Sequence, residues 1–171
     1  MMSGNLLLAV ALLLPVAGAL LIAATGKWPN LREAMTLTTA GLLLLVVLSI
    51  YSDLQAGARP ALVLIETLPG LPIALALEPL GMLFALVASF LWIVTSLYAI
   101  GYMRGHGEQH QTRFYICFAV AIASTMGIAL AGNMFTLFIF YEVLTLSTYP
   151  LVTHSGTPEA RRAGRVYLGL L

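Results

Sequence analysis

A single acidic residue, Glu142, lies near the middle of a long apolar stretch that covers residues 134–153. Burial in an apolar medium favours the protonated carboxyl group, so such a residue can bind and release a proton near neutral pH. A charge at the centre of a membrane helix costs roughly 2.5–3.5 kcal/mol, and acidic residues retained there usually mark an ion or proton path. Glu142 is therefore the candidate proton carrier; the alternative is a neutral, hydrogen-bonded contact between helices.

Three polar residues follow Glu142 on one face of the helix that this stretch predicts. At 100° per residue, that face continues towards the C-terminal end of the stretch through Thr145, Tyr149 and Thr153. In the other direction the same face continues as Phe138 and Phe135, which are apolar. The pattern predicts a half-channel that holds water on one side only and leads from one membrane surface to the carboxyl group.

Two further residues near the end of the stretch could serve this path. Pro150 has no amide hydrogen to donate to the carbonyl group of Leu146, so we expect the helix to kink or loosen there. His154 follows the apolar stretch, where its imidazole could pass protons to Tyr149. The commoner interpretation of His154 is a histidine at a helix end, stabilised by the helix dipole.

The composition of the 171 residues excludes most other classes of protein. Hydrophobic residues make up 60% of the chain and charged residues 9%, whereas soluble domains have about 25% charged residues. We therefore expect an all-α integral membrane protein rather than a soluble enzyme or a disordered chain. The net charge of +1 is too small for a nucleic-acid binder, and the single cysteine, Cys117, allows no disulfide framework. His106 and His110 are expected in a solvated loop, and we predict no metal and no cofactor.

Five stretches are long enough to cross a membrane, which takes roughly 20 apolar residues in a helix. They cover residues 6–25, 34–52, 79–103, 114–131 and 134–153. A sixth helix is predicted to start near Thr157-Pro158-Glu159, because these residue types suit a helix N-terminus. Residues 1–52 would then form the first two helices, residues 53–78 a loop on the outer side, and residues 79–171 the third helix to the start of the sixth.

The basic residues predict how the chain is oriented. The first, third and fifth connections carry seven of the eight, namely Lys27, Arg32, Arg104, Arg113, Arg161, Arg162 and Arg165. The opposite side carries only Arg59. Because basic residues gather on the cytoplasmic side, the N-terminus should lie outside. We expect a multi-pass protein of the cell (inner) membrane, surrounded by the lipid bilayer.

The loop between the second and third predicted membrane helices has the pattern of a short β-hairpin. Residues 61–65 and 73–77 are short apolar runs, and a turn rich in proline and glycine separates them at 66–72. The distribution of basic residues puts this hairpin on the outer side. We expect it to pack on another subunit or on the helix ends.

The fifth predicted span and its surroundings resemble a known family of membrane proteins. Tyr141-Glu142 is followed by Leu146-Ser-Thr-Tyr-Pro-Leu-Val-Thr-His154 and then by Thr157-Pro-Glu-Ala-Arg-Arg. This pattern is similar to the antiporter-like subunits of respiratory complex I, of Mrp-type multisubunit cation/proton antiporters and of membrane-bound hydrogenases. It looks closest to the Mrp type. Residues 73–84 resemble the family's segment from the hairpin into the third helix, so the resemblance covers about residues 73–171.

The resemblance implies a place for Glu142 in a larger subunit. In the family the corresponding glutamate of the fifth helix pairs with a lysine on the seventh helix, and both chain ends lie outside. This chain stops in the sixth helix, at about a third of a family member, so we expect a fragment of a longer subunit or a truncated subunit. The implied partners are other membrane subunits, and the implied ions are protons, with Na⁺ or K⁺ as alternatives.

Two rival functions stay open beside proton translocation. A truncated relative could be a transport-inactive structural or assembly subunit that holds its neighbours together. A small oligomeric channel could take the partner charge of Glu142 from another copy. Under none of these hypotheses does the chain carry out redox chemistry; a partner of the NADH:quinone oxidoreductase or hydrogenase type would supply it.

Overall fold

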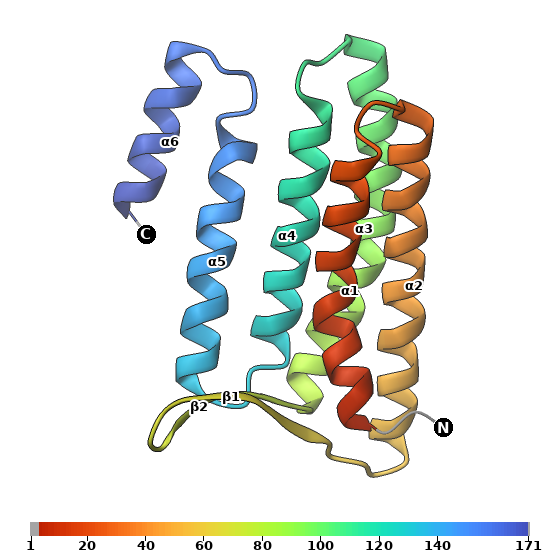
Figure 1. Ribbon diagram of the computed structural model, residues 1–171, viewed down its shortest axis with the longest axis vertical. Coiled ribbons are helices and arrows are strands. Elements are labelled where there is room, and N and C mark those ends of the chain that lie inside the picture. Colours follow the sequence, from red (N-terminus) through yellow and green to blue (C-terminus); the bar gives the residue numbers. More distant parts are fainter. Residues whose placement is uncertain (1–3, 171) are drawn as a thin grey trace.

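The computed structural model describes residues 4–170, so residues 1–3 and Leu171, the end of the predicted sixth helix, lie outside the described residues. The described part consists of helices and one β-hairpin (Figure 1). In chain order the elements are α1 (Gly4–Ala24), α2 (Pro29–Gln55), β1 (Ala61–Leu68), β2 (Leu71–Ala76), α3 (Pro79–His106), α4 (Gln111–Ala129), α5 (Met134–Val152) and α6 (Pro158–Leu170). The five predicted spans and the start of the sixth helix are present at the predicted places. The hairpin is present too, but its strands extend into the predicted turn of residues 66–72 and leave a turn of only residues 69–70.

Helices α1 to α5 are, within the described chain, long and apolar enough to cross a membrane. Local signals set their ends. Pro29 and Pro79 occupy the first turns of α2 and α3, where a missing amide hydrogen breaks no helical bond. Gly107 ends α3 with a left-handed backbone, φ 61°, as glycine does readily.

Helix α2 is longer than the predicted span of residues 34–52. Arg32, Glu33 and Asp53 all belong to it. Arg32 and Glu33 are almost fully buried, with 4% and 5% of their surfaces exposed. The prediction stopped short of these charges because an unpaired charge is costly to bury. In the fold both charges are paired, so the helix includes them.

The first four helices form a bundle, and α5 and α6 extend it on one side (Figure 1). Helix α4 packs against α1, α3 and α5, α2 packs against α1 and α3, and α6 packs against α5. Large, almost fully buried side chains fill the interior, among them Leu8, Ile22, Leu43, Trp92, Tyr115 and Met126. The outward faces are also apolar, with Leu20 69% and Leu80 79% exposed. Such a surface suits contact with lipid or with neighbouring subunits.

Backbone atoms of α3 and α4 come into close contact at the hairpin end of the bundle. Gly81 lies in the first turn of α3, and Ala129 is the last residue of α4. A Cβ atom at Gly81 would overlap the carbonyl oxygen of Ala129. Only glycine leaves room for this approach.

The hairpin packs on the helix ends, which is one of the two outcomes that the sequence allowed. Strands β1 and β2 pair antiparallel, and β2 also binds the turn between α4 and α5. The amide of Gly132 donates to the carbonyl of Ala74 at 2.8 Å, and the amide of Ala74 donates to Thr136 Oγ1 at 2.9 Å. Asn133 Nδ2 donates to the carbonyl of Pro72 at 2.8 Å. These bonds fix the start of α5 against the hairpin.

The substitution Asn133→Ala is expected to lower the thermal stability of the protein. Asn133 caps α5, because its side-chain oxygen accepts from the amide of Thr136 at 2.8 Å, while its nitrogen holds the hairpin. Loss of such a cap costs about 0.5–2 kcal/mol. Thermal unfolding of the detergent-solubilised protein measures the effect. Asn5→Ala, at an exposed position of α1, is the control, and equal unfolding temperatures for the two variants would contradict this role.

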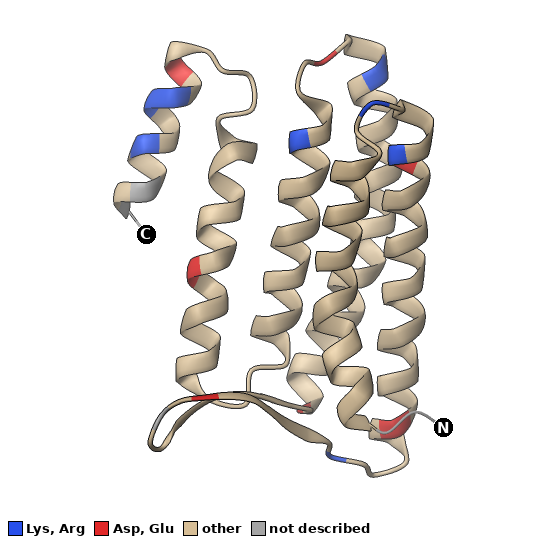
Figure 2. Cartoon of the chain, in the orientation of Figure 1, with Lys and Arg blue, Asp and Glu red and all other residues tan. Residues whose placement is uncertain are grey.

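The basic residues gather at one end of the bundle (Figure 2). This end, which we call the basic end, holds the α1–α2, α3–α4 and α5–α6 connections, and with them the seven basic residues of the first, third and fifth predicted connections. Arg59 lies at the opposite end, beside the hairpin. The predicted division of basic residues between two sides is therefore present in the fold.

Candidate functional site

Glu142 lies about halfway along α5 and is the only charged residue of that helix (Figure 2). Its side chain is exposed, as are those of Tyr141 and Val143 on either side. No hydrogen bond or ion pair joins its carboxyl group to another residue of the described range 4–170. Glu142 is thus not a polar contact between the described helices, and its exposed side can meet a group from outside them.

The polar residues predicted on the face of Glu142 divide between two environments. Thr145 is buried, with 8% of its surface exposed. Tyr149 and Thr153 are half-buried and lie nearer the basic end, where Thr153 Oγ1 donates to the carbonyl of Tyr149 at 3.0 Å. The structure brings Tyr149 and Thr153 together, whereas Thr145 and Glu142, three residues apart on α5, differ in burial.

Tyr149, Thr153 and His154 line a pocket of about 450 Å³ at the basic end. The α3–α4 connection and the first turn of α4 form the opposite wall. The remaining lining residues are Glu108, Gln109, His110, Arg113, Ser155, Gly156 and Arg161. The pocket is polar and roomy enough for water. It unites the three predicted path residues nearest the basic end, whereas Glu142 and Thr145 do not line it.

His154 is held at this pocket by neighbours from α4. Its backbone carbonyl accepts from Arg113 Nη2 at 3.3 Å, and the ring of Phe114 stands edge-on to its imidazole at 5.6 Å between centroids. Both ring nitrogens are buried and lack a hydrogen-bond partner among the described residues. Burial lowers the pKa of His154 from its ordinary value, and the charge of Arg113 lowers it further. His154 is therefore neutral at pH 7, with one donor and one acceptor nitrogen for a proton relay.

The substitution Arg113→Gln is expected to raise the pKa of His154. A guanidinium group disfavours the imidazolium form, so its removal favours protonation. Titration of ¹⁵N-histidine signals by NMR should give half-protonation below pH 6.5 in the unaltered protein and at a higher pH in the variant. Arg161→Gln changes a second arginine of the same pocket and should leave this titration in place. An unchanged titration in Arg113→Gln would contradict the assignment.

Helix α5 continues through Pro150 and ends two residues later, at Val152. Helix α6 packs closely against this end. A Cβ atom at Gly164 would overlap the side chains of Tyr149 and Thr153. The approach of α6 thus holds both side chains at the wall of the pocket. A kink at Pro150 stays a prediction.

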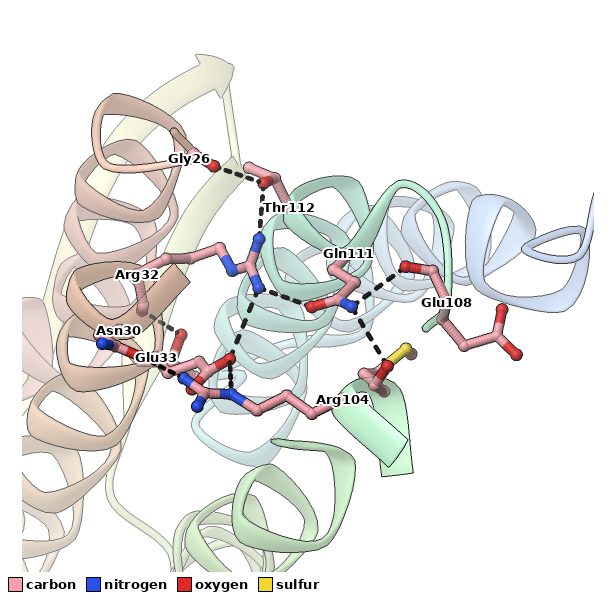
Figure 3. Close-up of polar contacts among 10 residues, drawn as sticks. Gly26, Asn30, Arg32, Glu33, Arg104, Glu108, Gln111 and Thr112 are labelled. Atoms are coloured by element: carbon pink, nitrogen blue, oxygen red, sulfur yellow. Dashed lines mark hydrogen bonds and ion pairs between the residues drawn. The ribbon is translucent and has the colours of Figure 1, made fainter. Parts of the chain in front are cut away.

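An ion cluster at the basic end, made of the buried Arg32 and Glu33 and the exposed Arg104, was not predicted (Figure 3). Arg104 Nε, from α3, donates to Glu33 Oε1 at 3.0 Å, and Arg32 Nη2 lies 3.6 Å from the same oxygen. The sequence pattern put Arg32 and Arg104 in separate connections, because nothing local shows that these connections meet. The one available signal was an acidic residue beside a basic one at the start of a span.

His106 and His110 do not share a site. His106 is the last residue of α3 rather than part of a loop, and its ring stacks on Tyr102 at 4.3 Å between centroids. His110 instead lines the pocket, with a left-handed backbone at φ 55°. Among the described residues, no group of three or more His, Cys, Asp and Glu side chains could hold a metal ion.

Comparison with known proteins gives matches over part of the chain. Residues 69–115 match the family model described as NADH-Ubiquinone oxidoreductase (complex I), chain 5 N-terminus. The chain is 35% identical over 85 residues to NADH-quinone oxidoreductase subunit N of Desulforudis audaxviator, covering 49% of this chain and 17% of that protein. It is 30% identical over 98 residues to one subunit of a probable K(+)/H(+) antiporter of Rhizobium meliloti, covering 57% and 17%. The matched segment is thus about a sixth of each relative.

Two solved structures share the fold. A chain of the membrane-bound sulfane sulfur reductase, an archaeal respiratory membrane complex, matches with a TM-score of 0.83 and 20% identity, covering 95% of this chain and 33% of that one. A chain of the Mrp complex from Dietzia sp. DQ12-45-1b matches with a TM-score of 0.79 and 20% identity, covering 99% and 32%. At this identity the likeness concerns the fold alone, and this chain spans about a third of each.

Proposed function

We propose that this chain takes part in translocating protons across a membrane. It would do so within a multisubunit complex, which either transports protons only or exchanges protons for another cation. The chain is similar in sequence and fold to the N-terminal part of antiporter-like membrane subunits. Its relatives belong to a quinone oxidoreductase and to a probable K(+)/H(+) antiporter. Glu142 binds the proton, and the chain itself performs no redox chemistry.

The position of Glu142 carries the proposal. It is a lone acidic residue in the middle of a helix that is long and apolar enough to span a membrane. Acidic residues retained at such depth usually serve an ion or proton path. The pocket at the basic end offers the entrance: protons pass from water to His154 and Tyr149, and then along α5 to Glu142.

A cation that approaches and leaves Glu142 would drive the exchange of its proton. A nearby positive charge stabilises the carboxylate and releases the proton, and withdrawal of that charge in apolar surroundings favours protonation again. The exposed side of Glu142 suits a cation from outside the described residues, and the family resemblance implies a lysine of the seventh helix. Moving one charge through 100 mV is worth about 2.3 kcal/mol, which is the scale of a respiratory driving force.

The orientation and the ion are part of the same proposal. The basic end faces the cytoplasm, because basic connections stay on that side of a cell (inner) membrane. The pocket is then the inner entrance. A lone carboxyl group can serve H⁺, Na⁺ or K⁺, so proton and cation fluxes have to be recorded separately.

Transport by a complex that carries Glu142→Gln tests the proposal. We expect the complex to assemble and to lose proton translocation. Unchanged transport would show that Glu142 is not the proton carrier. Failed assembly would favour the alternative function, a truncated and transport-inactive subunit that holds its neighbours together.

A further inference from the structure

The segment that joins α3 to α4 faces two sites at once. We call residues 107–113 the connecting segment. Four of its residues line the pocket, namely Glu108, Gln109, His110 and Arg113. Gln111 and Thr112 lie between them in sequence, yet their side chains accept hydrogen bonds from Arg32 of the ion cluster. Any movement of the segment relative to the cluster therefore also moves the pocket wall.

Gln111 makes three bonds that tie this segment down (Figure 3). Its side-chain nitrogen donates to the carbonyl of Met103 at 3.2 Å and to that of Glu108 at 3.0 Å. Its side-chain oxygen accepts from Arg32 Nη2 at 2.7 Å. One amide group thus joins the end of α3, the connecting segment and the first turn of α2.

Glu33 holds the other side of the cluster. Its carboxylate is buried between Arg32 and Arg104, and it accepts two bonds from Arg104. Breaking a buried ion pair by neutralising one partner leaves an uncompensated charge. Without the charge of Glu33, the buried guanidinium group of Arg32 has no anion beside it, and its position next to Gln111 is less stable.

The backbone of the connecting segment needs such support. Gly107 and His110 both have left-handed backbones, with φ of 61° and 55°. Glycine adopts this conformation freely, but a histidine does so at a cost. Strained backbone of this kind persists only where surrounding contacts hold it. The bonds of Gln111, the next residue, supply that hold for His110.

We propose that Gln111 and Glu33 are positioning residues for the pocket: they hold the connecting segment so that its charged side chains stay beside His154. The proposal rests on the proposed function of the pocket as the proton entrance. Neither residue touches the path itself. Their effect reaches His154 through the placement of Glu108, His110 and Arg113.

The charges around His154 explain how a displaced wall would change transport. Arg113 and His110 disfavour its protonated form and Glu108 favours it, while Arg161 lines the pocket from α6. Burial of His154 is the largest influence, followed by Arg113. A loosened wall admits water and moves Arg113 away, and both changes favour protonation. The pH of half-maximal transport should then rise.

The variant Gln111→Glu in the full-length subunit of the native complex tests the proposal. Glutamate keeps the shape and the acceptor for Arg32, but it cannot donate to the carbonyls of Met103 and Glu108. A carboxylate also suits the first turn of α4, so the helix itself is not weakened. Hydrogen exchange at residues 107–113 should become roughly tenfold faster, as the loss of two partly buried hydrogen bonds implies. In proteoliposomes the pH of half-maximal transport should rise, with a smaller effect on the maximal rate.

Matched variants keep the result interpretable. Gln55→Glu makes the same change at the opposite end of the bundle, where the side chain of Gln55 donates to Tyr51 of its own helix, and should alter neither readout. Glu33→Gln should change the exchange at residues 107–113 and the pH of half-maximal transport in the same direction as Gln111→Glu. Glu33→Asp keeps the charge, so both readouts should be closer to those of the unaltered protein.

Two outcomes would overturn the proposal: unchanged exchange at residues 107–113 in Gln111→Glu, or faster exchange with an unmoved pH profile. Failure of the proposed function shows differently. If the proposed function is wrong, the Glu142→Gln complex transports normally, and its hydrogen exchange at residues 107–113 equals that of the unaltered protein.

Discussion

Replacing Glu142 with glutamine is expected to abolish proton-coupled transport by the assembled complex while leaving the amount of complex unchanged. Glutamine has the same shape as glutamate but cannot bind and release a proton. A positioned proton-transfer group contributes on the order of a hundredfold or more to the rate it serves. The variant should fold, because the exposed carboxyl group has no hydrogen bond to the described residues.

The measurement is acidification of everted membrane vesicles, followed with a pH-sensitive dye, together with the yield of complex. Glu66→Gln is the matched control, because Glu66 is an exposed acidic residue of the hairpin, remote from α5 in sequence. That control should transport normally. Normal acidification in Glu142→Gln would remove this residue from the mechanism, and a low yield of complex would point to a structural role.

The second large effect is expected from Gly81→Ala, which should strongly destabilise the helix bundle. The added methyl group would overlap the backbone carbonyl of Ala129. A side chain could rotate away, but a carbonyl within α4 can move only if the two helices separate. Overpacking of this kind costs about 1–3 kcal/mol and occasionally more. The hairpin end of α3 and α4 would open, and with it the anchor of the hairpin.

Gly101→Ala provides the control on the same helix. A Cβ atom at Gly101 would meet open space, and alanine favours a helix more than glycine does. The unfolding temperature of the purified complex and its yield from membranes should both be lower for Gly81→Ala. Both should be unchanged for Gly101→Ala. Equal stability of the two variants would contradict the close backbone approach.

The helices and the hairpin follow from local sequence signals. The apolar stretch that became α5 has the length of a membrane span. Gly132-Asn133 before it forms a turn that interrupts the helical run, and Asn133 caps α5. Such signals act within a few residues, so they can be read without knowing what surrounds them. The same holds for Thr157 and Pro158 at the start of α6.

Which face of α5 is buried was less predictable than the length of the helix. Helical spacing puts Thr145 within a turn of Glu142, yet the first is buried and the second exposed. The difference arises because α4 covers one side of α5 and leaves the other open. Periodicity orders residues around a helix, but it does not say where the neighbouring helix ends.

The sequence by itself determined the membrane-helix architecture, the division of basic residues between two ends and the choice of Glu142. These depend on hydropathy, span length and residue type, all of which are local. Only the tertiary structure decided that Glu33 is buried beside Arg32 and pairs with the exposed Arg104, and that His110 and His154 share one pocket. These contacts join connections that are far apart in the chain, and their burial and charge pairing exist only once the helices have packed.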